Sequence, residues 1–226
     1  TAVITEAIDS GRTDAIDSRT IDLLTRSLQR LNSMVERALD YAVVEQYASP
    51  IAFKIVNLAG LIVQEFAAFE QVRRDRSIRL ELPQGPDSIE ALVEPALFKK
   101  CLQEVISNAH RYTPDGGSIF VSVIPEDLWV SVNFVNTGVE IPAEELRLLF
   151  TPFFKGRGAN AQSDGGTGLG LSIAWAAARL QGGTLSVESG PKCVRACLKV
   201  PSAITRRRST PVASDFRTPS RLSAKR

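Results

Sequence analysis

The sequence predicts an α+β protein: a two-layer α/β sandwich in which helices cover one face of a mixed sheet, preceded by a helical hairpin segment. Long stretches in which apolar residues recur every three or four positions indicate amphipathic helices. Short alternating stretches that end at proline, glycine or asparagine are typical of half-buried strands. The two kinds of stretch follow one another without a regular strand–helix–strand order, which argues against a purely parallel sheet.

Composition limits the classes of function. The 226 residues are 44% hydrophobic, enough for a buried core, and their net charge of +2 does not indicate a nucleic-acid partner. No apolar stretch approaches the ~20 residues of a membrane span and no signal peptide is recognisable, so we expect a cytoplasmic protein without a membrane segment. The chain starts at Thr1 rather than methionine, which suggests part of a longer protein that can itself be membrane-attached. Three cysteines without ligand spacing indicate reduced thiols, and a single histidine, His110, argues against a zinc site or a Ser-His-Asp triad.

The first predicted element is an amphipathic helix from Ser18, its expected N-cap, to about Gln46. Its polar face is most simply a solvated surface and carries Arg26, Arg30, Glu36 and Arg37. A helix end and a loop precede it in residues 1–16, so we expect a helical hairpin that packs either against a second copy of the chain or on its own domain. The apolar stripe of the helix consists of Ile21, Leu24, Leu28, Leu31, Val35 and Leu39.

A second part is predicted to begin near residue 49. From Ser202 the sequence is rich in Ser, Thr, Pro and Arg, which predicts a disordered basic tail. The expected parts are therefore 1–48, 49–201 and 202–226. The elements predicted within the second part are a strand at 51–56, a helix at 58–72, strands at 78–82 and 89–93, a helix from Pro95 to about Tyr112, a hairpin of strands 118–124 and 128–135, a short helix after Pro142, a helix at 168–180, and strands at 184–188 and 194–200.

The stretch GGTGLGLSIA, residues 165–174, has glycines at alternating positions that lead into an apolar helix. Glycine allows a ligand to approach the main chain closely. A helix that starts there directs unpaired N–H groups and the positive end of its dipole at that ligand. A phosphate group is the favoured ligand, although glycine clusters before helices also form ordinary turns.

Polar residues elsewhere supply further candidates for a site. Glu104 and Asn108 are four residues apart, hence on one face of a predicted helix, and together suit a proton acceptor and a hydrated Mg²⁺ ion. Polar residues on one helix face also simply meet water. Asn136, where a predicted strand ends, is able to bond a purine edge that Gly138 lets come close, although NTG is also an ordinary turn. The candidates for closing the site are Phe150, Phe153, Phe154 and Lys155.

In this order and spacing the stretches resemble the ATP-binding domain of sensor histidine kinases, within the ATPase group that also includes DNA gyrase, Hsp90 and MutL. EVISNAHRYT resembles the asparagine box, NTGVEIP the first glycine box, LFTPFFKG the phenylalanine box and GGTGLGLSIA the second glycine box. The resemblance covers about residues 51–201, and the helix at 18–46 resembles the second helix of the dimerisation and phosphotransfer hairpin. The phosphoacceptor histidine motif is not in the sequence, since His110 lies inside the asparagine box.

The resemblance implies ATP and Mg²⁺ as cofactors and assigns roles by position. Asn108 takes the place of the Mg²⁺ ligand, Glu104 that of a group that assists transfer, and Asn136 that of an aspartate that receives the adenine amino group. Residues 155–167 would form a mobile lid. The other nucleotide-binding positions implied are Arg111, Tyr112, Gly138, Ile141, Phe153, Lys155, Gly166, Thr167, Gly168, Leu169 and Gly170.

The implied function is transfer of the γ-phosphoryl group of ATP to a histidine that this sequence does not contain, for relay to an aspartate of a response regulator. The implied partners are the phosphoacceptor helix, a second copy of the chain and a response regulator receiver domain. We expect Asn108→Asp, or Gly168→Ala combined with Gly170→Ala, to abolish ATP binding while leaving the protein folded.

Three departures from the family pattern keep an alternative open. Asn136 is a neutral amide in place of a carboxylate, Glu140 replaces a glycine, and PKCVRAC is an altered last glycine box. These favour a non-catalytic phosphotransfer or scaffolding protein with a decayed nucleotide pocket. A gyrase-type ATPase clamp, in which Glu104 would activate water, is disfavoured by the helix that precedes the domain.

Overall fold

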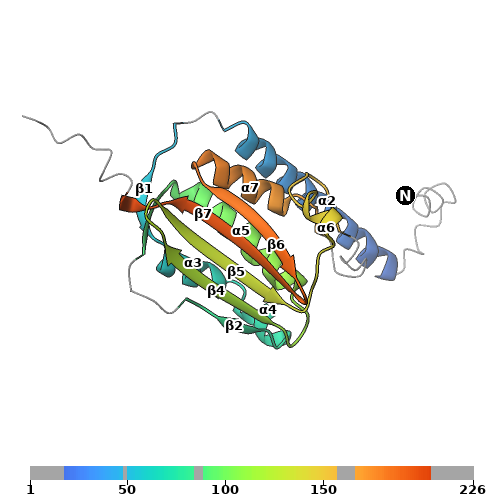
Figure 1. Ribbon diagram of the computed structural model, residues 1–226. Helices are drawn as coiled ribbons and strands as arrows, with labels where there is room; N and C mark the ends of the chain where they lie inside the picture. Colours follow the sequence, from blue (N-terminus) through green and yellow to red (C-terminus); the bar gives the residue numbers. More distant parts are fainter. Residues whose placement is uncertain (1–17, 48–49, 84–88, 157–165, 205–226) are drawn as a thin grey trace, which may run out of the picture.

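The computed structural model describes residues 18–47, 50–83, 89–156 and 166–204. Its main feature is a five-stranded sheet with the order β2-β4-β5-β7-β6 (Figure 1). Strand β2 is parallel to β4 and the other neighbours are antiparallel, so the sheet is mixed, as predicted. The strands are β2 (Arg79–Glu81), β4 (Ser118–Pro125), β5 (Trp129–Thr137), β6 (Thr184–Gly190) and β7 (Cys193–Pro201).

Helices α3 (Leu58–Ala67), α5 (Pro95–Tyr112) and α7 (Gly170–Leu180) cover one face of this sheet, which confirms the two-layer arrangement (Figure 1). Helices α5 and α7 pack directly against each other. The layers meet in one apolar core, where each large side chain contributes about 1.5–3 kcal/mol by leaving water. Fully buried residues of this core include Phe98, Leu102, Ile106, Ile119, Val132, Ile173 and Leu198.

The start of α5 follows from its local sequence. Pro95 occupies the first turn, where its missing N–H costs no hydrogen bond. The Glu94 side chain caps the helix by accepting a hydrogen bond from the Leu97 N–H at 2.6 Å. At the other end, the Thr113 N–H donates to the Ala109 carbonyl and ends the helix at Tyr112, where it was predicted to end.

The predicted helix at 58–72 is interrupted. Helix α3 ends at Ala67, and α4 (Glu70–Asp75) begins after Phe69, whose φ and ψ of −104° and 5° are not helical. Phe69 turns its ring onto His110 of α5, so a tertiary contact replaces the continuous periodicity expected from the sequence.

A pair of short strands and residues 202–203 lie outside the five-stranded sheet. Strand β1 (Lys54–Asn57), predicted to start at residue 51, pairs with β3 (Glu90–Val93) as a separate two-stranded sheet. Ser202 and Ala203 are buried, and the Ser202 N–H donates to the Leu128 carbonyl at 2.9 Å. These residues were predicted as the start of the tail, whereas 205–226 lie outside the described residues.

Helix α2 (Ser18–Glu45) precedes the sandwich and packs on α7, with Val44 buried in the core. The side chain of Ser18, the expected cap, is not among those described. The apolar stripe is largely exposed, with values of 65% for Leu28 and 59% for Leu31. Within the described ranges this stripe is not covered by its own domain, and residues 1–16, the expected hairpin partner, lie outside them.

The remaining connections include α6 (Ala143–Leu146), the short helix expected after Pro142.

Cys101, Cys193 and Cys197 are free thiols, as predicted, and burial raises the pKa of the Cys101 thiol. In the part of the chain that the structure describes, no helix is long and apolar enough to cross a membrane.

Candidate functional site

A cavity of about 170 Å³ lies between the C-terminal half of α5, the end of β5 and the start of α7. Of the fourteen residues predicted for catalysis or nucleotide binding, the structure brings ten together at the cavity wall. Four others lie outside this lining: Glu104, Gly138, Phe153 and Leu169. The predicted residues that line it are Asn108, Arg111, Tyr112, Asn136, Ile141, Lys155, Gly166, Thr167, Gly168 and Gly170.

Asn108 is held at the crossing of α5 and α7. A Cβ added to Gly170 would lie 3.5 Å from the amide nitrogen of Asn108, so the glycine allows the two helices to approach at this point. Among the described residues, the side chain of Asn108 has no hydrogen-bond partner. Its amide oxygen is therefore available to a ligand or metal ion in the cavity.

The N-terminus of α7 opens into the same cavity. Gly170 and Leu171 of its first turn line the wall, and Leu169 provides no side-chain cap. The first N–H groups of a helix lack intrahelical acceptors and carry the positive end of its dipole. This end of the cavity is therefore suited to an anion, as the glycine run predicts.

Gly166 and Gly168 each lie too close to a different neighbour to carry a side chain. A Cβ at Gly166 would lie 2.8 Å from Nη1 of Arg111. Gly168 has a φ of +75°, and a Cβ there would lie 2.6 Å from the carbonyl carbon of Phe153, which also donates its N–H to the Gly168 carbonyl. Gly168→Ala would therefore strain the point where residues 153 and 168 pack together, so we expect it to lower stability as well as to affect nucleotide binding.

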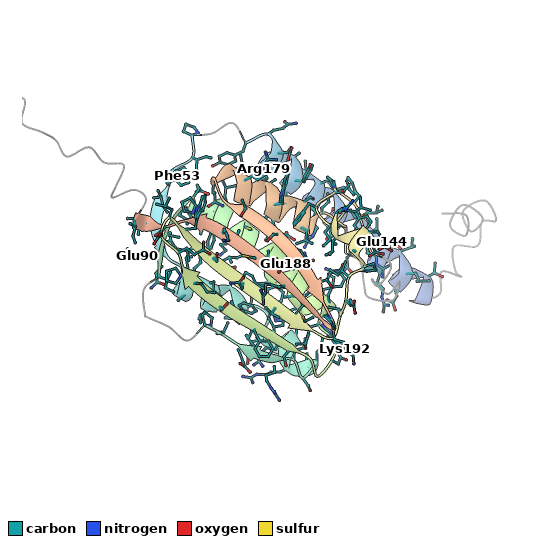
Figure 2. The ribbon with its side chains drawn as sticks, in the orientation of Figure 1. Phe53, Glu90, Glu144, Arg179, Glu188 and Lys192 are labelled. Atoms are coloured by element: carbon teal, nitrogen blue, oxygen red, sulfur yellow. The ribbon has the colours of Figure 1, made fainter. Side chains whose placement is uncertain are left out.

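The aromatic cluster is divided between several environments. Phe154 lines the cavity, whereas Phe153, expected to help close the site, is 65% exposed and has a φ of +65°. Phe150 stacks on Trp175 with ring centroids 6.3 Å apart. On the same indole, the guanidinium of Arg179 lies 4.5 Å from the ring centroid, near the C-terminal end of α7 (Figure 2).

Asn136, the next-to-last residue of β5, lines the cavity, where it is 7% exposed and has no hydrogen-bond partner within the described ranges. Gly138, predicted to admit a ligand edge, instead packs on Pro114: a Cβ would lie 2.4 Å from the proline Cγ. Its N–H donates to the carbonyl of Lys192, in the turn between β6 and β7 (Figure 2). The glycine therefore serves the turn and not the cavity wall.

Glu104 and its partner adjoin the cavity. The Glu104 side chain is 7% exposed, and its Oε2 accepts a hydrogen bond from Nη1 of Arg37 at 2.7 Å. Arg37 belongs to α2 and also lines the cavity, so the expectation of a solvated surface is wrong for this residue. The periodicity of α2 gave no signal for this contact, because only the docking of α2 on the sandwich brings the two helices together.

Residues 93–203 match the family described as histidine kinase-, DNA gyrase B- and HSP90-like ATPase. This part of the chain belongs to that ATPase family. The chain is similar to the sensor histidine kinase GlrK of Escherichia coli (strain K12), with 29% identity over 184 residues, 81% of this chain and 38% of GlrK. The chain thus spans less than half the length of this relative.

Solved structures agree with this assignment. The catalytic domain of the histidine kinase ThkA is 27% identical, with a TM-score of 0.60, over 67% of this chain and 96% of that one. A structure of ThkA in complex with the response regulator TrrA has a TM-score of 0.67 at 23% identity, over 89% of this chain and 57% of that one. The expected resemblance is confirmed: the chain contains the ATP-binding catalytic domain of the sensor histidine kinase type.

In this ATPase domain, His110 lies outside the cavity wall and is buried. Burial lowers the pKa of His110, and the nearby charges of Arg76 and Arg73 act in the same direction. No group of three or more acidic, histidine or cysteine side chains able to hold a metal ion occurs in the described part of the chain.

Proposed function

We propose that this chain binds ATP with Mg²⁺ in the cavity and is the catalytic part of a sensor histidine kinase. The observation that carries the proposal is the convergence on one cavity of the unpaired Asn108 amide, the unpaired Asn136 amide and the N-terminus of α7. These are, respectively, a group for a metal ion, a group for a base edge and a group for phosphates. An adenine nucleotide needs one group of each kind.

Magnesium fits this donor set as an ion held mainly by the nucleotide. Mg²⁺ is commonly bound through substrate phosphates, waters and one or two protein oxygens. The Asn108 amide oxygen, without a partner in the described structure, is the protein oxygen that fits. The ion would neutralise charge on the phosphates, while Asn108 and the first turn of α7 would position them.

The proposed reaction is phosphoryl transfer to a histidine nitrogen. The imidazole nitrogen forms a bond to the γ-phosphorus, the bond from that phosphorus to the β,γ-bridging oxygen breaks, and ADP leaves. The chain's own contribution is to hold the nucleotide in line and to exclude water. Glu104, beside Asn108 on α5, is the proposed acceptor for the proton that the imidazole loses.

Further proposals concern partners and place. The phosphorylated histidine would pass its phosphoryl group to an aspartate of a response regulator, and the exposed apolar stripe of α2 would pair with a second copy of the chain and its phosphoacceptor helix. Of residues 155–167, which the resemblance implied as a lid, 157–165 lie outside the described residues. A protein that uses ATP and a response regulator is expected in the cytoplasm.

A second candidate is a scaffolding protein with a decayed nucleotide pocket. Two features favour this candidate. Glu140, a carboxylate residue, lines the cavity where the family pattern has a glycine, and Asn136 is a neutral amide. A carboxylate near the bound phosphates would weaken nucleotide binding by repulsion between like charges. The two candidates therefore differ in whether ATP binds at all.

Isothermal titration with ATP and Mg²⁺ distinguishes them. We expect binding by the unmodified chain and at least about tenfold weaker binding by Asn108→Asp, which places a negative charge beside the phosphates. Asn133→Asp is the matched control, because Asn133 lies on the opposite face of β5 from Asn136. No heat with the unmodified chain at millimolar ATP would reject the kinase proposal in favour of the scaffold.

A further inference from the structure

Two ion pairs join α2 to α5. Arg37 bonds to Glu104 at 2.7 Å, and Asp40 bonds to Lys100. Arg37 and Asp40 are three residues apart and Lys100 and Glu104 four, so each helix presents one basic and one acidic side chain on a single face. The pairing is complementary in one register only, because sliding α2 by one turn would place like charges opposite each other.

Of these four residues, only Arg37 also lines the cavity of the ATPase domain. Its Nη1 lies 3.7 Å from the position of a Cβ on Gly170, and Asn108 lies at the same point. These neighbours belong to the phosphate end of the proposed site, since Gly170 starts α7 and Asn108 faces its first turn. The guanidinium of Arg37 on α2 is therefore placed where phosphates are expected.

The chemistry of the group suits that place. A guanidinium offers five N–H donors in a planar fork that matches phosphate oxygens, and it stays charged at all relevant pH values. Within the described residues, Arg37 has one acceptor, Oε2 of Glu104, so further donors are available toward the cavity. Its side chain is 28% exposed, against 7% for Glu104, so the guanidinium can move more easily than the carboxylate.

We propose that Arg37 binds the terminal phosphate of ATP, so that the docked helix α2 completes the nucleotide site of the ATPase domain. This inference rests on the proposed function, and it adds a specificity: the site distinguishes ATP from ADP through a residue outside the ATPase domain. Glu104 holds the guanidinium at the cavity before the nucleotide arrives. By linkage, ATP binding in turn stabilises α2 in its docked position.

Two simpler roles for Arg37 make different predictions. If Arg37 only docks α2, its loss weakens ATP and ADP binding equally, because neither phosphate chain is contacted. If Arg37 only neutralises Glu104, its loss is harmless once Glu104 is also neutral. A direct bond to the terminal phosphate predicts an effect on ATP alone that persists when Glu104 is neutral.

The test measures the Kd of ATP and of ADP, each with Mg²⁺, for the unmodified chain, Arg37→Gln, Glu104→Gln and the double variant. We expect Arg37→Gln to weaken ATP binding about tenfold in the Glu104→Gln background, and to change ADP binding less than about twofold. The control is Asp40→Asn, which breaks the second ion pair away from the cavity but keeps the guanidinium, and it should change the ratio of the two Kd values much less than Arg37→Gln does.

Equal losses for ATP and ADP, or no loss in the Glu104→Gln background, would overturn the inference and leave Arg37 as a docking or neutralising residue. A change of the ATP-to-ADP ratio in Asp40→Asn as large as that in Arg37→Gln would overturn it as well, because weaker docking of α2, and not the loss of the guanidinium, would then explain the selectivity. If the unmodified chain binds neither nucleotide, the proposed function fails first, and this inference falls with it.

Discussion

The imidazole ring of His110 lies against the ring of Phe69, with centroids 4.7 Å apart and planes 16° apart. Phe66 borders the same imidazole at a centroid distance of 5.6 Å. Nδ1 lies 2.9 Å from the Ile106 carbonyl oxygen, while the buried Nε2 has no partner in the described structure. The geometry fits a neutral ring that carries its proton on Nδ1, because a cation here would lose its hydration without compensation.

This burial predicts a pH dependence of stability. The pKa of His110 is lowered in the folded state, so below about pH 6.5 the unfolded chain binds a proton that the folded chain does not. The free energy of unfolding should therefore decrease as the pH is lowered below about 6.5. The decrease from this residue is up to about 1.4 kcal/mol per pH unit, and it stops once the pH is below the folded pKa. His110→Phe, which cannot titrate, should flatten this part of the profile in urea denaturation between pH 7.5 and 5.5. An unchanged slope in the variant would assign the effect to other groups.

A second prediction concerns the contact between Gly138 and Pro114. Gly138→Ala combines a left-handed backbone, φ +90°, with a Cβ only 2.4 Å from the proline ring, so we expect a loss of about 1–3 kcal/mol in the free energy of unfolding. The matched change is Gly60→Ala in α3, where nothing lies within 4 Å of the added Cβ. That variant should be stabilised by about 0.5–1 kcal/mol. Equal effects of the two substitutions in denaturant titrations would contradict this account.

Helix periodicity and caps were sufficient to predict much of the fold. Helix α5 matches its predicted bounds because Pro95 and the Thr113 turn define its ends locally. The break at Phe69 was missed because its cause is a ring on another helix. The residues around Phe69 give no sign that its ring packs on His110, and the hydrophobic spacing continues through the break.

The predicted site shows the same limit. The sequence predicted that Asn108, Asn136 and the glycines 166, 168 and 170 belong to one site, and the structure brings them to one cavity. It did not predict the role of Arg37, since a basic residue on the polar face of a helix looks solvated whether or not another domain covers it. Glycine composition likewise did not reveal that Gly138 serves a turn against Pro114.

A third prediction uses Asn136 as a probe of base recognition. If its amide oxygen accepts from the adenine amino group, Asn136→Asp supplies a charged acceptor in the same shape, and a charge-assisted hydrogen bond is roughly twice as strong. We expect ATP to bind about three- to tenfold more tightly to the variant. Inosine triphosphate, which has a carbonyl in place of the amino group, should not gain. A similar gain for both nucleotides in calorimetry would show that Asn136 does not contact that edge.

The exposed stripe of α2 predicts self-association. Its side chains Leu28 and Leu31 are 65% and 59% exposed, and a covered stripe would bury this apolar surface. We expect a weak, concentration-dependent dimer in sedimentation velocity that Leu28→Glu converts to a monomer. Gln29→Glu, on a different side of the helix, adds the same charge and should leave association unchanged. A dimer that persists in Leu28→Glu would place the contact elsewhere.

The last prediction is that His110 does not accept phosphate. A phosphoryl acceptor must present a ring nitrogen in line with the γ-phosphorus. His110 is 3% exposed, its Nδ1 bonds within α5, and its ring is packed between Phe66 and Phe69. Residues 1–226 alone should therefore gain no acid-labile label from [γ-³²P]ATP, whereas a separately supplied helix with an exposed histidine should become labelled. Label on the chain itself that disappears in His110→Gln would show that α5 opens far enough to release this ring, and the aromatic packing would then be a closed state of the site.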